Sequence, residues 1–188
     1  MKQGWQTLEV FLENCKSLPI SPMLRLLLAS DGSTTRSFNS LFLLPVRLEL
    51  VSQYEMAVDG LQSSRLGVSR GEKAIERAVW LKVVERDKPE RKLLYAVSTI
   101  PISHCKPDLY QELQIAQKPL GQIIEERGLA THRDCFKVAC LPFPQVARGL
   151  ALKEDTLFWA RRYRLSISEE ISVLIREVFS PGLSLSSS

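Results

Sequence analysis

The spacing of hydrophobic residues predicts helices in the first part of the chain. Within residues 7–15, leucine, phenylalanine and cysteine recur at helical spacing, which is typical of a helix with one buried side. A second helix is expected over residues 22–29, because Ser21 can cap its N-terminus and a proline occupies its first position. Residues 33–38 are compatible with a further turn of helix and also with a loop.

From residue 46 onward, hydrophobic and polar residues alternate, which indicates a β-strand with one solvated face. Later segments are rich in valine, isoleucine, tyrosine and tryptophan, which are residues that favour strands. The expected strands cover residues 46–50, 75–84, 93–102, 133–141, 157–168 and 171–180.

The segments between these strands predict a hairpin, a tight turn and two more helices. The charged residues 85–91 are expected to join their flanking strands as a hairpin, and residues 169–170 to form a tight turn. Short helices are predicted over residues 107–116 and 119–127. The polar residues 63–72 are predicted to form a long connection.

The order of these elements is helices, strands, helices and strands again, without regular alternation of strand and helix. This order favours an α+β fold, in which an antiparallel β-sheet has its helices packed on one face. A length of 188 residues fits a single domain. We expect that domain to cover residues 1–181, with a flexible polar tail at residues 182–188.

The composition argues against several classes of protein. The net charge of +4 is too small to indicate a nucleic-acid partner, although it slightly favours an anionic small molecule. No hydrophobic run approaches the roughly 20 residues of a membrane span, and no signal peptide is recognised. The four cysteines show no disulfide spacing, so we expect a reducing, cytoplasmic setting.

Two charged residues interrupt strand faces that are otherwise hydrophobic. Glu177 shares one face of the last strand with Ile175 and Phe179, and Arg77 shares one face of an earlier strand with Val79. Because an unpaired charge is costly to bury, both side chains should have partners.

Three interpretations of these charges remain open. Arg77 and Glu177 can pair with each other as a structural salt bridge. Alternatively, the buried face of the earlier strand is the opposite one, which carries Ala78 and Trp80. In the third interpretation, both charges line a closed pocket whose ligand carries an anionic group and a hydroxyl group.

Other candidate residues give weaker signals. His132, Cys135 and Cys140 do not have the spacing of a zinc site, so no metal is expected. His104 and Cys105 are neighbours on a strand and should point to opposite faces, which disfavours a nucleophile and base pair.

The remaining polar clusters also have structural explanations. Arg161, Arg162 and Arg164 are expected to form a partly solvated basic face, with attraction of an anionic substrate as the alternative. Ser33 and the two threonines after it are expected to cap a helix rather than to contact substrate, although a loop over the pocket is an alternative.

A series of short motifs follows one another along the chain. The motifs are DGSTTR at 31–36, RAVWL at 77–81, AVSTIPIS at 96–103, PLG at 119–121, THRD at 131–134, WARRYR at 159–164 and EVFSP at 177–181. No single motif is diagnostic, but their order and spacing over residues 28–181 are together fairly specific. In this order they resemble the chorismate pyruvate-lyases of bacteria, cyanobacteria and plastids.

This resemblance implies an enzyme that splits chorismate into 4-hydroxybenzoate and pyruvate, the first step of ubiquinone or plastoquinone head-group synthesis. It implies that Arg77 binds the carboxylate of the product, that the backbone amide of Leu120 shares this role, and that Glu177 lies near the ring hydroxyl. The family needs no metal or organic cofactor, and it suggests a monomer.

The sequence departs from the family pattern in places. An alternative alignment makes Lys82 the carboxylate-binding residue in place of Arg77, although the Arg-x-Val-x-Leu pattern favours Arg77. Val97 stands where the best-known bacterial members carry arginine, and the turn between residues 84 and 93 is longer.

Two other functions stay open at this point. A non-catalytic small-acid sensor domain of the same fold would bind a ligand without chemistry, although no helix-turn-helix pattern precedes residue 20. A relative with the same pocket would instead act on another chorismate-like ligand.

Overall fold

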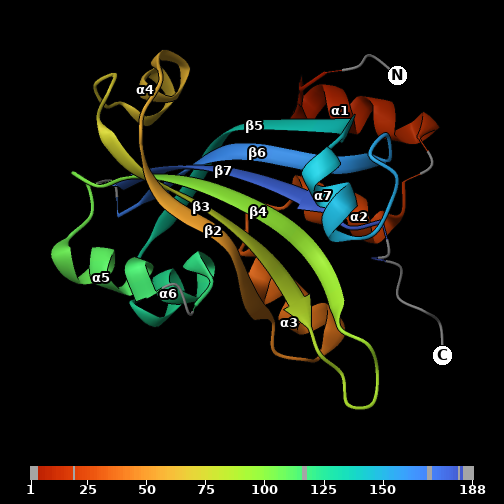
Figure 1. Cartoon of the computed structure of the whole chain (residues 1–188). Helices are drawn as coiled ribbons and strands as arrows, with labels where there is room; N and C mark the ends of the chain where they lie inside the picture. Colours follow the sequence, from red (N-terminus) through yellow and green to blue (C-terminus); the bar gives the residue numbers. More distant parts are fainter. Residues whose placement is uncertain (1–3, 19, 116–117, 169–170, 182, 184–188) are drawn as a thin grey trace.

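The fold is organised around one antiparallel sheet with the strand order β1-β5-β6-β7-β4-β3-β2 (Figure 1). The computed structural model describes residues 4–18, 20–115, 118–168, 171–181 and 183. The strands are β1 (Gln6–Thr7), β2 (Arg47–Ala57), β3 (Lys73–Val83), β4 (Arg91–Pro101), β5 (Thr131–Pro142), β6 (Leu157–Ile167) and β7 (Ile171–Phe179). The helices are α1 (Leu8–Asn14), η1 (Cys15–Ser17), α2 (Pro22–Ala29), α3 (Thr34–Phe42), α4 (Gly60–Leu66), α5 (Pro107–Ile115), α6 (Leu120–Glu126) and α7 (Pro144–Gly149). The predicted single-domain α+β class is confirmed.

The face of the sheet that carries Arg77 and Glu177 is covered by two groups of helices. At one end, hydrophobic side chains of α1, α2 and α3 pack against strands β3, β4 and β7. At the other end, α5 and α6 pack against β6 and β7. Both groups bury a continuous hydrophobic surface, the main force that holds helices on a sheet. These five helices lie on one face, as predicted.

Two short helices lie on the opposite face and were not predicted. Helix α4 starts with a capping box, in which Asp59 and Gln62 bond each other's backbone amides. It occupies part of the segment expected to be a plain connection, and Leu66 packs beside Leu174. Helix α7 lies directly on Trp80, because a Cβ atom at Gly149 would come within 2.7 Å of the indole ring.

The predicted strands are present, and their ends differ from the prediction by one or two residues. The exception is β2, which lies at one edge of the sheet. Strand β2 is much longer than predicted, and its register shifts between Leu50 and Ser52. This irregularity breaks the alternation of hydrophobic and polar residues, so the pattern ends early although the strand continues. Residues 34–38 belong to helix α3 and Ser33 is its N-cap, which settles the alternative left open above in favour of a helix.

Some predictions fall partly outside the described residues. The tight turn at 169–170 lies outside them, and so do residue 116 and most of the predicted tail. Leu183, which belongs to that tail, is described and is buried in the hydrophobic cluster that includes residues of α1 and α2. No helix among the described residues is long and hydrophobic enough to cross a membrane.

Candidate active site

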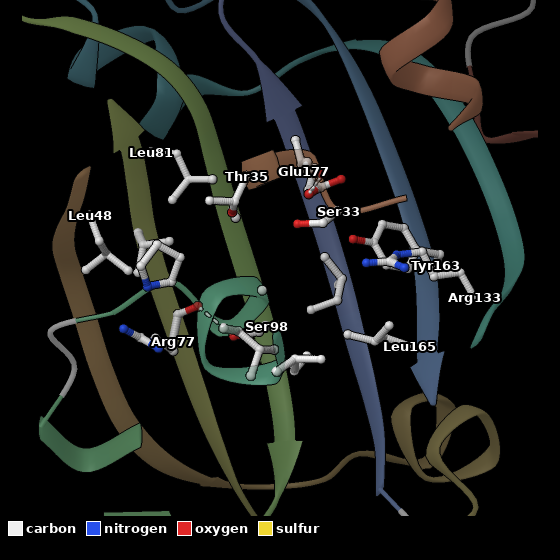
Figure 2. Close-up of a pocket in the computed structure, with 18 residues that line it drawn as sticks. Ser33, Thr35, Leu48, Arg77, Leu81, Ser98, Arg133, Tyr163, Leu165 and Glu177 are labelled. Carbon is white, nitrogen blue, oxygen red and sulfur yellow. Dashed lines mark hydrogen bonds between the residues drawn. The ribbon is translucent and has the colours of Figure 1, made fainter. Parts of the chain in front are cut away.

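A cavity of about 80 Å³ lies on the helix-covered face of the sheet, between the starts of α3 and α6 (Figure 2). This is several times the space of about 10–15 Å³ that one water molecule needs. Arg77, Leu120 and Glu177 all line it, so the structure brings the three sequence-predicted residues together. Hydrophobic side chains form a large part of the remaining wall: Leu48, Val79, Leu81, Ala96, Ile124, Leu165 and Ile175.

Arg77 on β3 is a buried cation without an anionic partner. Its side chain is 3% exposed, and it forms no ion pair with any described residue. Its Nη2 donates a hydrogen bond to the carbonyl oxygen of Lys118 at 2.9 Å, whereas its Nε is buried with no partner. Burial lowers the pKa of the Arg77 guanidinium, because desolvation disfavours the charged form.

The backbone before and at the start of α6 lies beside this guanidinium. Leu120 is the first residue of α6, and the first amides of a helix have no partner within it. A Cβ atom on Gly121 would lie 3.2 Å from the Oγ of Ser33, so α3 and α6 approach closely here. The N-termini of both helices therefore meet at the cavity, where their dipoles favour a negative charge.

Glu177 on β7 stands in a network of its own. It is 5% exposed, and its Oε2 accepts a hydrogen bond from the Nε of Arg161 at 2.5 Å. Its Oε1 accepts one from the hydroxyl of Thr34 at 2.6 Å. Arg161 also donates through Nη2 to Thr34 Oγ1 at 2.8 Å, so the three side chains form a closed set.

The position of Arg161 corrects the sequence-based expectation. This residue was predicted to lie on a partly solvated basic face, but it is 1% exposed. Its Nη1 donates to the carbonyl oxygens of Leu27 and Ser30, each at 2.6 Å. Burial is the largest single influence and lowers the pKa of Arg161, but Glu177 and Tyr163 together outweigh it, so the pKa of Arg161 is raised.

Two of the interpretations of the buried charges can now be judged. Arg77 and Glu177 do not pair with each other, because Arg161 holds Glu177. The opposite face of β3 is also buried, since Ala78 and Trp80 pack under α7. Both faces of this strand are therefore in the interior, and the cavity lies on the face that carries Arg77.

Ser33 has the capping role predicted for this segment, whereas Thr34 has a different role. Ser33 is the N-cap of α3 and accepts a hydrogen bond from the amide of Arg36. Thr34 binds Glu177, and Ser33, Thr34 and Thr35 all line the cavity.

Sequence reasoning missed three polar residues of the cavity: Ser98, Tyr163 and Arg133. Figure 2 shows the hydroxyl of Tyr163 pointing into the cavity, with Arg133 beside it. Burial, and then the nearby Glu177, raise the pKa of Tyr163 to about 12. Arg133 donates to the carbonyl oxygen of Asp31 at 2.7 Å, and its Nε is buried with no partner. Arg133 belongs to the THRD motif, but nothing in that motif alone indicates a cavity.

The residues that departed from the family pattern do not line this cavity. Lys82 forms ion pairs with Glu49 at 2.9 Å and Glu90 at 2.7 Å. Val97 packs on the other face of the sheet, in the core cluster under α7.

The cysteines and histidines form no obvious chemical centre. Among the described residues, no three His, Cys, Asp or Glu side chains are grouped as they would be around a metal ion. Burial raises the pKa of the Cys105 thiol to about 11, which keeps it protonated and therefore a poor nucleophile.

Comparison with known protein families gives a match over most of the chain. The family described as "Chorismate pyruvate-lyase Rv2949c-like" matches residues 28–186. Among curated proteins, no sequence relative was found.

Solved structures with a similar fold include transcriptional regulators. PhnF from Mycobacterium smegmatis has a TM-score of 0.61 at 19% identity, covering 81% of this chain and 65% of PhnF. The effector domain of PhnF alone gives 0.61 at 18% identity, covering 80% of this chain and 89% of that domain. A GntR-family transcriptional regulator from Enterococcus faecalis gives 0.55 at 13% identity, with coverages of 71% and 93%. At such low identities the similarity establishes the fold alone.

Proposed function

The chain belongs to the Rv2949c-like chorismate pyruvate-lyase family, and on this premise we propose that it converts chorismate into 4-hydroxybenzoate and pyruvate. The observation that carries the proposal is the buried guanidinium of Arg77, which faces the cavity without an anionic partner. A buried charge of this kind is expected to meet an anion from outside the chain. The product would then supply the head group of a quinone.

In this proposal the ring carboxylate of chorismate binds at the Arg77 end of the cavity. The planar guanidinium can donate two parallel hydrogen bonds to a carboxylate, and the amide of Leu120 adds a third donor. The hydrophobic walls exclude water from the ring, which strengthens these charged hydrogen bonds.

The spacing of the two charged residues suits a single six-membered ring. Arg77 is aligned across β4 with Ser98 and then with Ile175 on β7, two residues before Glu177. With strands about 4.8 Å apart and a rise of about 3.4 Å per residue, the two Cα atoms are separated by roughly 12 Å. Side chains that reach inward from both ends leave room for one ring between them.

Glu177 is placed to orient the ring hydroxyl. Each carboxylate oxygen already accepts one hydrogen bond and keeps a second lone pair. In the reaction, the carbon–oxygen bond of the enolpyruvyl ether breaks, and the hydroxyl-bearing ring carbon loses its proton. The ring becomes aromatic, and the enolpyruvyl group leaves and gains a proton to give pyruvate. Positioning and electrostatics are the contributions that we assign to the protein.

Arg133 and Tyr163 are proposed to bind the leaving group. Chorismate is a dianion, and Arg133 supplies a second, half-buried cation for the enolpyruvyl carboxylate, with a buried Nε that has no partner. Because its pKa is raised to about 12, Tyr163 keeps its proton and can donate a hydrogen bond to the ether oxygen.

The test is to incubate the pure protein with chorismate and to measure 4-hydroxybenzoate by absorbance and pyruvate by an independent assay. Equal amounts of both products support the lyase. Arg77→Ala and Glu177→Gln should abolish turnover, whereas Arg148→Ala should retain it. Arg148 is a suitable control because it is exposed, pairs with Glu154 and lies outside the cavity.

The second candidate is a small-acid sensor, which the fold shared with the PhnF effector domain favours. A sensor would bind 4-hydroxybenzoate with the same dependence on Arg77 but would release no pyruvate from chorismate. Binding without turnover in a folded protein would therefore overturn the lyase proposal. Turnover of a related dianion but not of chorismate would point to another substrate.

A further inference from the structure

A second hollow of about 420 Å³ lies on the opposite face of the sheet from the cavity. Strands β3 to β7 and helix α4 contribute residues to its lining. Figure 1 shows α4 beside one end of these strands. Trp5 contributes another part of the lining. Five cationic side chains line this hollow, which we call the basic groove: Arg65, Lys137, Arg162, Arg164 and Arg176.

Three of these cations stand in a row across the sheet. Lys137 on β5 is aligned with Arg162 on β6, and Arg162 is aligned with Arg176 on β7. Like charges directly opposite one another on neighbouring strands destabilise a sheet. Arg161 on β6 and Glu177 on β7 are the next residues along the same strands and point to the other face of the sheet. There the two opposite charges form an ion pair.

Carboxylates inside the protein compensate only part of this charge. Asp134 binds Arg164 through both oxygens, at 2.9 and 2.5 Å. Glu76 lines the groove but accepts a hydrogen bond from the hydroxyl of Tyr54. No ion pair with a described carboxylate forms at the other four cations, although Glu9 on α1 interacts with Lys137 at longer range.

The resulting balance leaves a strong positive potential in the groove. Its five cations and two carboxylates, Glu76 and Asp134, give a net charge of +3. The Nε of Arg176 is buried without a hydrogen-bond partner. Burial, and then repulsion from Arg65 and Arg176, lower the pKa of Arg162. The neighbouring cations therefore disfavour its positive charge.

We propose that the basic groove binds a small molecule carrying a diphosphate group. Guanidinium groups match phosphate oxygens with pairs of parallel hydrogen bonds, and four arginines converge here. Two linked phosphates carry about three negative charges near neutral pH, which balances the net charge of the groove. A volume of about 420 Å³ exceeds a bare diphosphate, so an organic group attached to it would also fit.

Trp5 gives the groove a place for such an organic group. The guanidinium of Arg162 lies over the indole ring, with its carbon 4.5 Å from the ring centroid. This contact orients both side chains at the edge of the groove, where a flat ring attached to the diphosphate would pack.

The experiment is a titration of the full chain with inorganic diphosphate, and separately with adenosine diphosphate, followed by calorimetry. Both should bind, and raising the salt concentration should weaken both. Tighter binding of the nucleotide means that the organic group contributes, and equal binding means that the diphosphate alone is recognised. Binding of neither one overturns the proposal, and no catalytic activity is needed for the test.

Variants of single arginines distinguish specific binding in the groove from non-specific attraction to a basic surface. Arg176→Gln and Arg162→Gln should each weaken diphosphate binding about tenfold, whereas Arg148→Gln should leave it unchanged. Without ligand, Arg176→Gln should unfold at the same or a higher temperature, because it relieves the row of like charges; Lys137→Gln offers a second variant. Equal weakening by Arg148→Gln, or equally tight binding of a single-stranded oligonucleotide, would show a non-specific basic surface and overturn the proposal.

Discussion

Arg161 and Glu177 lie directly opposite each other on β6 and β7 and form a buried ion pair, with Nε and Oε2 2.5 Å apart. Thr34 closes the network from α3. Arg77 lies in the same cavity without such a partner. One end of the cavity is therefore fixed by the protein itself, whereas the other end offers a charge that a ligand can satisfy.

Replacing Arg77 should separate stability from function. Arg77→Met removes a desolvated charge while keeping a side chain of similar length, so the ligand-free protein should gain about 1 kcal/mol of stability. That gain raises the unfolding temperature by about 2–4 °C in a chain of this size. The same variant should weaken 4-hydroxybenzoate binding about 100-fold, measured by calorimetry.

Arg77→Lys provides the matched comparison for this prediction. It keeps the charge but not the planar fork, so it should recover only part of the binding. If Arg77→Met lost several kcal/mol of stability while still binding the acid normally, Arg77 would be a structural residue.

Breaking the buried ion pair should destabilise the fold. Arg161→Leu leaves the carboxylate of Glu177 buried without its cation, which typically costs about 3–5 kcal/mol. Arg162→Gln is the matched control: it also removes one positive charge from β6, but on the opposite face of the sheet. It should lower the free energy of unfolding by less than about 0.5 kcal/mol. Urea unfolding of both variants measures the difference, and equal losses would contradict the role of the pair.

Strand periodicity in the sequence identified Arg77 and Glu177, because each interrupts a hydrophobic face. It could not identify Arg161 as the partner of Glu177. Arginines occupy both faces of β6, and only the alignment with β7 decides that Arg161 faces the carboxylate while Arg162 faces Arg176. Which residues face each other on neighbouring strands depends on the order of the strands in the sheet. The periodicity of a single strand carries no information about that order.

Other parts of the site depend on which helix covers which strand. Tyr163 and Arg133 border a cavity because α3 and α6 close over the sheet there, a contact between segments far apart in the sequence. Helix α7 has only six residues, too few for a hydrophobic period to be recognised. Helix α4 was missed although its capping box was visible in the sequence.

The stability of the protein at high pH should depend on Tyr163. Its pKa is raised from 10 to about 12 in the folded state, so the unfolded chain releases this proton first as the pH rises. The stabilisation is fully present below pH 10 and is lost between pH 10 and 12, at up to about 1.4 kcal/mol per pH unit. Urea unfolding at pH 9, 10 and 11 should therefore show a steeper loss for the native chain than for Tyr163→Phe. Parallel curves would contradict the raised pKa.

The ion pair between Arg36 on α3 and Glu125 on α6 should control release of the product. It joins the two helices whose N-termini meet at the cavity, at 2.6 Å, with its side chains 67% and 51% exposed. An exposed pair adds less than about 1 kcal/mol to stability, so Arg36→Ala should unfold at nearly the native temperature. If the ligand leaves between α3 and α6, which approach closely over the cavity, the variant should release 4-hydroxybenzoate several times faster in a stopped-flow displacement assay. Arg148→Ala breaks an equally exposed pair away from the cavity and should not change this rate. An unchanged rate in Arg36→Ala would mean that the ligand leaves by another route.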